Sequence, residues 1–271
     1  INFNSKKKLK RIDQIDIDLV NNNGQNSQLN IKRKKGNYSI NSKIFDGTKI
    51  LDRILFSKSN GNFFDVFEKL NSKITINFNT IYITNEDYLT NFKADMIVNN
   101  NQIKDLILSS RFATKEDLKL SIKTNSNNEK ITDLFAGNAK PLVKKYDFIK
   151  GFEGGYLKFD SIEKNKVSNS NLKIFDFKLK EVPALTKLLT LASLQGIADL
   201  LTGEGIRFNE FEMIFNNKAG LMTIEEIYSL GPSISILMDG YIQKDDLVSL
   251  RGTLVPATTV NKVIGSIPLI G

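Results

Sequence analysis

Residues 183–215 read PALTKLLTLASLQGIADLLTGEGIRFNEFEMIF, an almost wholly apolar helical stretch that leads into alternating strands. The alternation continues into residues 250–271, LRGTLVPATTVNKVIGSIPLIG. A helix that is apolar nearly all round has to be buried, and a strand with one apolar face needs a cover on that face. No catalytic residue type is concentrated near either stretch. The combination favours a surface that holds something apolar over a site of chemistry.

Proline and glycine mark the two ends of the helix predicted over residues 183–202. Pro183 suits a first helical turn, and Gly203 stands where a C-terminal glycine cap belongs. Gln195 and Asp199 interrupt the apolar run, which argues against a transmembrane span of roughly 20 apolar residues. An ordinary core helix and a helix lining an apolar groove both remain open. The side chains expected to pack in such a groove are Leu185, Leu188, Leu189, Leu191, Leu194, Ile197, Leu200 and Leu201.

Period-two alternation of apolar and polar residues dominates the rest of the chain. It predicts antiparallel strands, about a dozen of them, each with one wet and one dry face. In residues 172–179 the pattern continues with an offset, because Leu172 and Ile174 are followed by Phe177 and Leu179. The residues expected to line the dry face as a lipid groove are Phe92, Ala94, Met96, Val98, Leu118, Leu120, Ile122, Ile234, Ile236, Met238, Leu250 and Leu254.

Asn- and Gly-rich breaks predict the turns, at residues 21–24, 99–101, 125–128 and 216–220. The Asn/Gln tract at 21–30 is interpreted as a loop. Three further helices are expected, at 62–70, at 131–146 with a break at Pro141, and at 257–264.

The predicted fold is mainly β with a few helices. We expect an elongated antiparallel sheet, curled into an apolar groove, with the helix at 183–202 packed on it. One 20-residue helix is about 30 Å long, whereas a dozen strands extend beyond about 50 Å, so one helix leaves part of the face uncovered. Closure into a barrel or sandwich is the alternative. The chain is interpreted as one continuous fragment, with N-terminal strands at 1–60, strands and short helices at 61–182, and a C-terminal block at 183–271.

Composition narrows the possible functions. Cys, His and Trp are absent from the 271 residues, which excludes disulfides, thiolate metal sites, imidazole bases and Ser-His-Asp triads. The net charge of +8 is spread along the chain without interleaved aromatic residues, so a nucleic-acid platform is poorly supported. We expect no enzyme, no cofactor, no metal ion and no nucleic-acid partner.

Carboxylate pairs and glycine clusters have simpler interpretations than catalysis. Asp16 and Asp18 fall on the wet face of their strand, and Asp245 with Asp246 suits a hairpin turn. Glu225 with Glu226 is likewise expected to be solvated. The segments Gly151–Gly155 and Gly203–Gly205 lack the Lys-Ser/Thr ending of a phosphate loop and are interpreted as turns.

Three blocks resemble the AsmA-like C-terminal region of bacterial envelope proteins, in particular its YhdP branch. They are LLTLASLQGIADLLTGEGIRFNEFE (188–212), YSLGPSISILMDGYI (228–242) and LRGTLVPATTVNKVIGSIPLIG (250–271). Their order and spacing fit as well, and the resemblance is strongest across 183–271. The segments FKADMIV and GYLKFD occupy compatible places before it.

The resemblance implies a function that the pattern alone does not. Such proteins look like long β-sheet rods anchored in the inner membrane, which cross the periplasm and carry phospholipid toward the outer membrane, supporting envelope integrity. The anchor and further strands are expected to lie outside this sequence, which begins at Ile1. The partner is then phospholipid or another acyl-chain lipid. A charge at Met96 or Ile236 is expected to block its passage more than one at Lys119. The alternative is a periplasmic scaffold that affects outer-membrane protein insertion without transporting lipid.

Overall fold

The computed structural model describes residues 2–3, 8–20, 24, 26–48, 63–145, 151–180, 205–243 and 247–256. These residues are mainly β-structure, as the alternation predicts. The strands are β1 (Asn2–Phe3), β2 (Leu9–Arg11), β3 (Gln14–Val20), β4 (Asn26–Lys34), β5 (Asn37–Asp46), β6 (Ser72–Tyr82), β7 (Tyr88–Asn99), β8 (Gln102–Phe112), β9 (Asp117–Thr124), β10 (Lys130–Ala136), β11 (Phe152–Lys164), β12 (Val167–Leu179), β13 (Ile206–Lys218), β14 (Leu221–Leu230), β15 (Ile234–Ile242) and β16 (Val248–Pro256). Two short helical elements accompany them, η1 (Phe63–Val66) and α2 (Lys140–Lys145).

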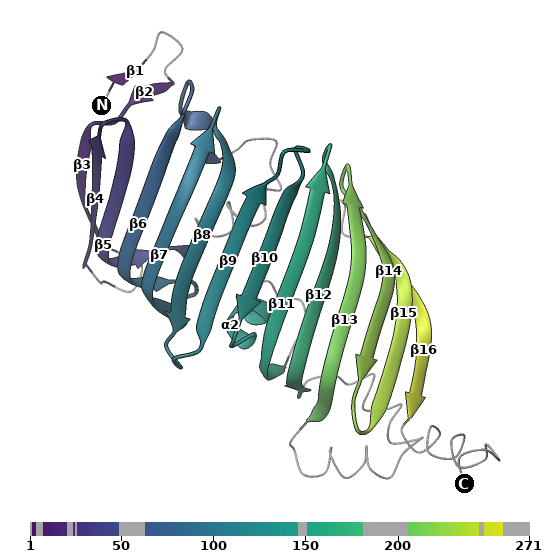
Figure 1. Cartoon of the computed structure of the whole chain (residues 1–271). Coiled ribbons are helices and arrows are strands. Elements are labelled where there is room, and N and C mark those ends of the chain that lie inside the picture. The colour runs from purple at the N-terminus through teal and green to yellow at the C-terminus, as the bar shows by residue number, and fades with distance from the viewer. Residues whose placement is uncertain are drawn as a thin grey trace, which may run out of the picture. The chain divides into compact units, whose positions relative to one another are not determined.

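Strands β3 to β16 follow one another in a single 14-stranded hydrogen-bonded order, and β1 with β2 forms a separate two-stranded sheet (Figure 1). The order ends at β3 and at β16, which do not pair with each other, so the sheet is not closed. The chain divides into two compact units, Ile1–Phe135 and Ala136–Gly271, which we describe in turn.

Two details of the predicted fold are wrong. The sheet is not strongly curled within either unit, because its hairpins add strands side by side and nothing returns the last strand to the first. Strands β5 and β6 also pair in parallel, with Ile40 beside Ile76, whereas the neighbouring pairs β4–β5 and β6–β7 are antiparallel. A parallel pair needs a long crossover connection, and the chain between Asp46 and Ser72 supplies it.

In the first unit the pairing register places the apolar residues of successive strands on one face. Phe45, Phe78 and Phe92 lie on this face, and their rings form a stacked ladder across β5, β6 and β7. The ring centroids are 4.8 Å apart for Phe45 and Phe78 and 5.8 Å apart for Phe78 and Phe92. Cross-strand aromatic pairs of this kind stabilise a sheet in one register.

The helix expected at 62–70 is a single 3₁₀ turn, η1. The Phe67 N–H donates to the Phe64 carbonyl, but the next N–H, that of Glu68, donates to the Leu9 carbonyl of β2. The chain leaves the helix at that point because a strand carbonyl accepts the bond that a further turn would need. Spacing of the phenylalanines alone could not reveal this competing partner.

In the second unit a local backbone reversal explains the offset at residues 172–179. Asp176 on β12 and Gly154 with Gly155 on β11 have φ values of 54°, 73° and 76°. These left-handed residues interrupt the alternation, so Ile174 and Phe177, three positions apart, are both buried. A Cβ at Gly155 would lie 2.8 Å from the Phe175 carbonyl oxygen, so no other residue fits this kink within β11 without a shift. The turn predicted over 151–155 is confirmed at Gly151 and is wrong from Phe152 onward, where β11 begins.

The helix expected at 131–146 is also wrong over its first half. Residues 130–136 form β10, and α2 begins at Lys140, whose N–H donates to the Asn138 side-chain oxygen. Pro141 therefore lies in the first turn, where a missing N–H costs nothing, and does not break a longer helix.

Most predicted turns are confirmed. Residues 99–101, 125–128 and 216–220 lie at or next to the hairpin connections β7–β8, β9–β10 and β13–β14. The loop predicted over 21–30 is wrong from residue 26 onward, because β4 begins at Asn26 and pairs with β3. The helices predicted at 183–202 and 257–264 lie outside the described residues.

The aromatic ladder of the first unit gives a stability prediction. We expect Phe78→Ala to lower the free energy of unfolding by about 3–5 kcal/mol, because a buried ring between two others is removed. The control Lys93→Ala, at an exposed position on the opposite face, is expected to change it by less than about 0.5 kcal/mol. Chemical denaturation of both variants tests this, and equal losses would show that the ladder does not hold the unit together.

Candidate functional site

The candidate lining residues of the first unit lie on one face of three adjacent strands. Phe92, Ala94, Met96 and Val98 come from β7, and Leu118, Leu120 and Ile122 come from β9. Strand β8 connects the two sets, because Ala94 pairs with Leu108 and Leu108 pairs with Leu120. All seven side chains are between 2 and 8% exposed. The register thus brings them together on a buried apolar face.

Sequence reasoning missed the residues that join these two sets. Leu106 and Leu108 on β8, and Ile74 and Phe78 on β6, belong to the same buried face. The alternation at 106–112 carried the signal, although Ser110 interrupts its apolar series. Strands β3 to β10 contribute to this unit as neighbours in one sheet.

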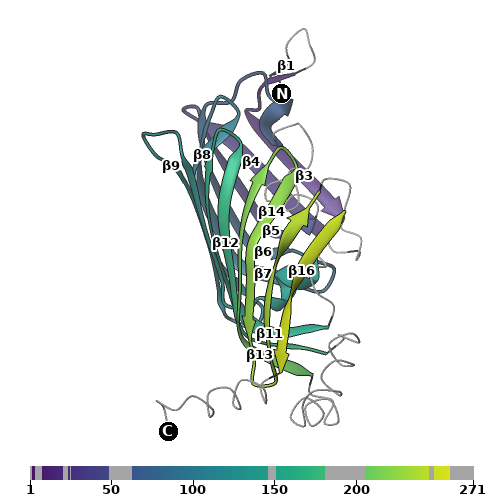
Figure 2. The ribbon, with the colours of Figure 1, turned by 90° about the vertical axis from the view of Figure 1, so that its right-hand side faces the viewer.

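In the second unit the candidate residues again share one face, but they are more accessible. Ile236 pairs with Leu254, and Leu250 pairs with Gly240, which stands two residues beyond Met238. Ile234 is 1% exposed, whereas Leu250 is 39% and Leu254 is 38% exposed. Both leucines lie on β16, the last strand in the order and the one facing the viewer in Figure 2.

We call the apolar face of strands β13, β14, β15 and β16 the C-terminal apolar face. Its rows follow the register, with Met213 beside Ile227 and Ile227 beside Met238. Sequence reasoning did not include β13 and β14 in it. Its members are Phe211, Met213, Phe215, Asn217, Met222, Ile224, Ile227, Ser229, Ile234, Ile236, Met238, Gly240, Ile242, Val248, Leu250, Gly252 and Leu254.

Charged side chains of these four strands lie on the opposite face or in a bulge of β14 between Ile224 and Ile227. Glu212 pairs with Tyr228 and Tyr228 with Leu237, a row between two rows of the C-terminal apolar face. Asp239 and Arg251 pair in the same way on the exposed side, with the guanidinium 3.0 Å from the carboxylate. None of the residues of β13–β16 on the C-terminal apolar face is charged.

The buried hydroxyl groups of the second unit have partners within the protein. Ser229 donates to the Glu210 carbonyl at 3.0 Å, and Ser161 and Ser170 hydrogen-bond each other at 2.8 Å. These groups therefore gain little from a polar ligand.

Glu212 is the most strongly held carboxylate of the polar face. Burial alone would raise its pKa, but hydrogen bonds from Lys173 at 3.0 Å and from Asn171 at 2.8 Å outweigh burial and lower it. The same contact raises the pKa of Lys173. Asn171 Oδ1 is buried and has no partner within the described residues. The cluster ties β12 to β13 as a structural ion pair.

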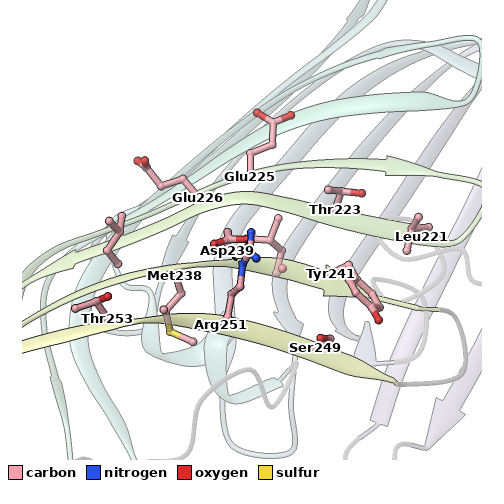
Figure 3. A pocket seen from close by; sticks show the side chains of 14 residues that line it. Leu221, Thr223, Glu225, Glu226, Met238, Asp239, Tyr241, Ser249, Arg251 and Thr253 are labelled. Atoms are coloured by element: carbon pink, nitrogen blue, oxygen red, sulfur yellow. Dashed lines mark hydrogen bonds and ion pairs between the residues drawn. The ribbon is translucent and has the colours of Figure 1, made fainter.

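A depression of about 820 Å³ lies over β14, β15 and β16. Figure 3 shows Asp239 and Arg251 at its centre, with Tyr241 and Leu221 toward one end and Thr253 toward the other. Glu225 and Glu226 also line it, and Asn216 donates to Glu225 at 3.1 Å. Its central charges neutralise each other as an ion pair, and the two glutamates leave the lining net negative.

The other carboxylate candidates are separate from this depression. Asp16 is exposed and accepts hydrogen bonds from Gln14 and Asn30, which lower its pKa. Asp245 and Asp246 lie outside the described residues. Within those residues, no three carboxylate side chains gather closely enough to hold a metal ion.

The predicted groove-packing residues of the segment 183–202 all lie outside the described residues. Their contact with the sheet stays a prediction. Among the helices that the structure does describe, none is long and apolar enough to cross a membrane.

Comparisons with known proteins give no relative. No family model, no curated protein and no solved structure matches this chain.

The Lys173–Glu212 pair gives a pH prediction. Because folding lowers the Glu212 pKa below its usual 4.5, the stability that this carboxylate contributes is present above pH 4.5 and is lost as pH falls through the folded-state pKa. We expect Glu212→Gln to flatten the decline of unfolding free energy below pH 4.5. Glu226→Gln removes the same charge at an exposed position and serves as the control. The prediction is tested by chemical denaturation at several pH values. An equal decline of the unfolding free energy below pH 4.5 in the wild type and in Glu212→Gln would contradict it.

Proposed function

We propose that this chain is a lipid-carrying segment of a bacterial envelope protein, with acyl chains lying on the apolar face of its sheet. The segment belongs to a periplasmic protein anchored in the inner membrane, which carries phospholipid toward the outer membrane and supports envelope integrity. Membership of the AsmA-like family, YhdP branch, is part of the same proposal. It rests on the three blocks at 188–212, 228–242 and 250–271.

The observation that carries the proposal is the C-terminal apolar face, which is uncharged and partly accessible. Leu250 and Leu254 expose more than a third of their surface on it. Each CH₂ group withdrawn from water gains about 0.8 kcal/mol, so an acyl chain of ordinary length is held without any specific bond. Movement along such a face costs little, because the chain exchanges one apolar surface for another.

The second candidate is a periplasmic scaffold that affects outer-membrane protein insertion without carrying lipid. The first unit favours it, because the predicted lining residues there are between 2 and 8% exposed. A face that is already buried stabilises the fold and leaves little room for a guest. The two candidates differ in whether lipid contacts the apolar face at all.

Photo-crosslinking at neighbouring residues on opposite faces tests the proposal. A photoreactive amino acid replaces Ile236 on the apolar face or Leu237 on the polar face, which is 51% exposed. We expect lipid adducts from Ile236 in cell membranes and few from Leu237, although Leu237 is the more exposed of the two. Equal labelling of both positions would defeat lipid carriage on this face.

A charge on the apolar face gives the matching functional test. Ile236→Asp is expected to impair outer-membrane integrity, measured by detergent sensitivity of cells, whereas Leu237→Asp and Lys119→Asp are not. Met96→Asp tests the first unit, but Met96 is buried, so its folding has to be checked by denaturation. Impairment by Leu237→Asp as severe as by Ile236→Asp would favour the scaffold.

A further inference from the structure

The C-terminal apolar face offers a ligand no charged side chain, and its polar side chains are Ser229 and Asn217, the latter beside the β13–β14 hairpin. Charged side chains such as Glu212, Asp239 and Arg251 alternate with it and point to the other side. The backbone groups of β14 and β15 face neighbouring strands on both sides. Ser229 is bonded to the Glu210 carbonyl. Away from Asn217, an occupant of this face is therefore held by apolar contact.

This chemistry distinguishes an acyl chain from a peptide. A peptide laid on the sheet brings its own N–H and C=O groups, and each that loses water without a partner costs about 1–3 kcal/mol. An acyl chain brings no such groups.

Methionine placement is an independent observation that favours the same occupant. The chain has four methionines, and three of them, Met213, Met222 and Met238, lie on the C-terminal apolar face. All three are half-buried, whereas Met96 in the first unit is buried. The unbranched thioether side chain adapts to variable apolar partners and is common on promiscuous binding surfaces. Lipid chains of different length and unsaturation are such partners.

We infer that the C-terminal apolar face is an acyl-chain site that does not select the headgroup charge of a phospholipid. The inference rests on the proposed function and specifies its substrate class. It runs against the composition, because a net charge of +8 by itself predicts a preference for anionic lipid. Strands β13–β16 carry three basic and five acidic residues, so these strands contribute none of that basic excess to the site.

The experiment measures which lipid the protein extracts. Vesicles of equal parts phosphatidylcholine and phosphatidylglycerol are incubated with the protein and removed by flotation, and the lipid left on the protein is quantified by mass spectrometry. Salt is varied from about 0.1 M to about 1 M, over which the Debye length falls from about 10 to about 3 Å. We expect the two lipids in proportions within about threefold of each other at both salt concentrations, because no ion pair contributes.

Matched variants locate the site. Leu254→Lys and Thr253→Lys add the same charge to neighbouring positions of β16 on opposite faces. Leu254→Lys is expected to lower the extracted lipid severalfold, whereas Thr253→Lys leaves it unchanged. Leu250→Lys with Ser249→Lys repeats the comparison, so that misfolding of one variant does not decide the result. Equal effects of both members of each pair would overturn the assignment of the face.

The outcomes separate this inference from the proposed function. An enrichment of phosphatidylglycerol by about tenfold or more, abolished at high salt, would show headgroup recognition and overturn the inference while lipid carriage stands. Extraction of neither lipid would contradict the proposed function itself. A stable dimer that excludes lipid would place a second copy on the face and would overturn both.

Discussion

The structure depends on the strict separation of the two faces of the sheet. Side chains in a strand alternate, so a slip of one residue would move every apolar side chain of that strand into water and bury its charged neighbours. Ala94, Leu108 and Leu120 share a row in the first unit, as Met213, Ile227 and Met238 do in the second. Each row fixes the register of the next strand, and the register in turn sets where each hairpin turns.

Interruptions of the alternation are placed so that the faces stay separate. The left-handed residues Gly154, Gly155 and Asp176 occur on adjacent strands at nearly opposite positions, so β11 and β12 reverse together. The stacked rings of Phe152 and Phe177, 5.1 Å apart, lie at one end of this kink. In β14 a bulge between Ile224 and Ile227 leaves both of these residues on the apolar face and Glu225 and Glu226 exposed. Such devices let a long sheet accommodate irregular sequence without burying charge.

The sequence predicts the strands and their faces well, because alternation is a local property. The candidates on β7, β9, β15 and β16 do share a face within their units. Helices were harder, since the Phe63–Val66 turn ends where Leu9 of a distant strand accepts a hydrogen bond. The parallel pairing of β5 with β6 was also beyond local pattern, because the same alternation suits either direction.

Accessibility could not be predicted from the pattern either. Met96 and Leu254 occupy equivalent positions in an alternating strand, yet Met96 is 4% exposed and Leu254 is 38% exposed. Partner strands alone do not produce this difference, because Met238 on β15 also has a partner strand on each side and is only half-buried. Apolar faces of similar composition thus differ in exposure between the two units, buried on β7 and more accessible on β16.

Native mass spectrometry of the protein purified from cells tests the central claim most directly. The account predicts that a fraction of the molecules carries additional mass equal to whole phospholipids, and that the mass is released by gentle activation, as expected for apolar contact. A protein that is always free of lipid, at the mass of its polypeptide alone, would contradict the account.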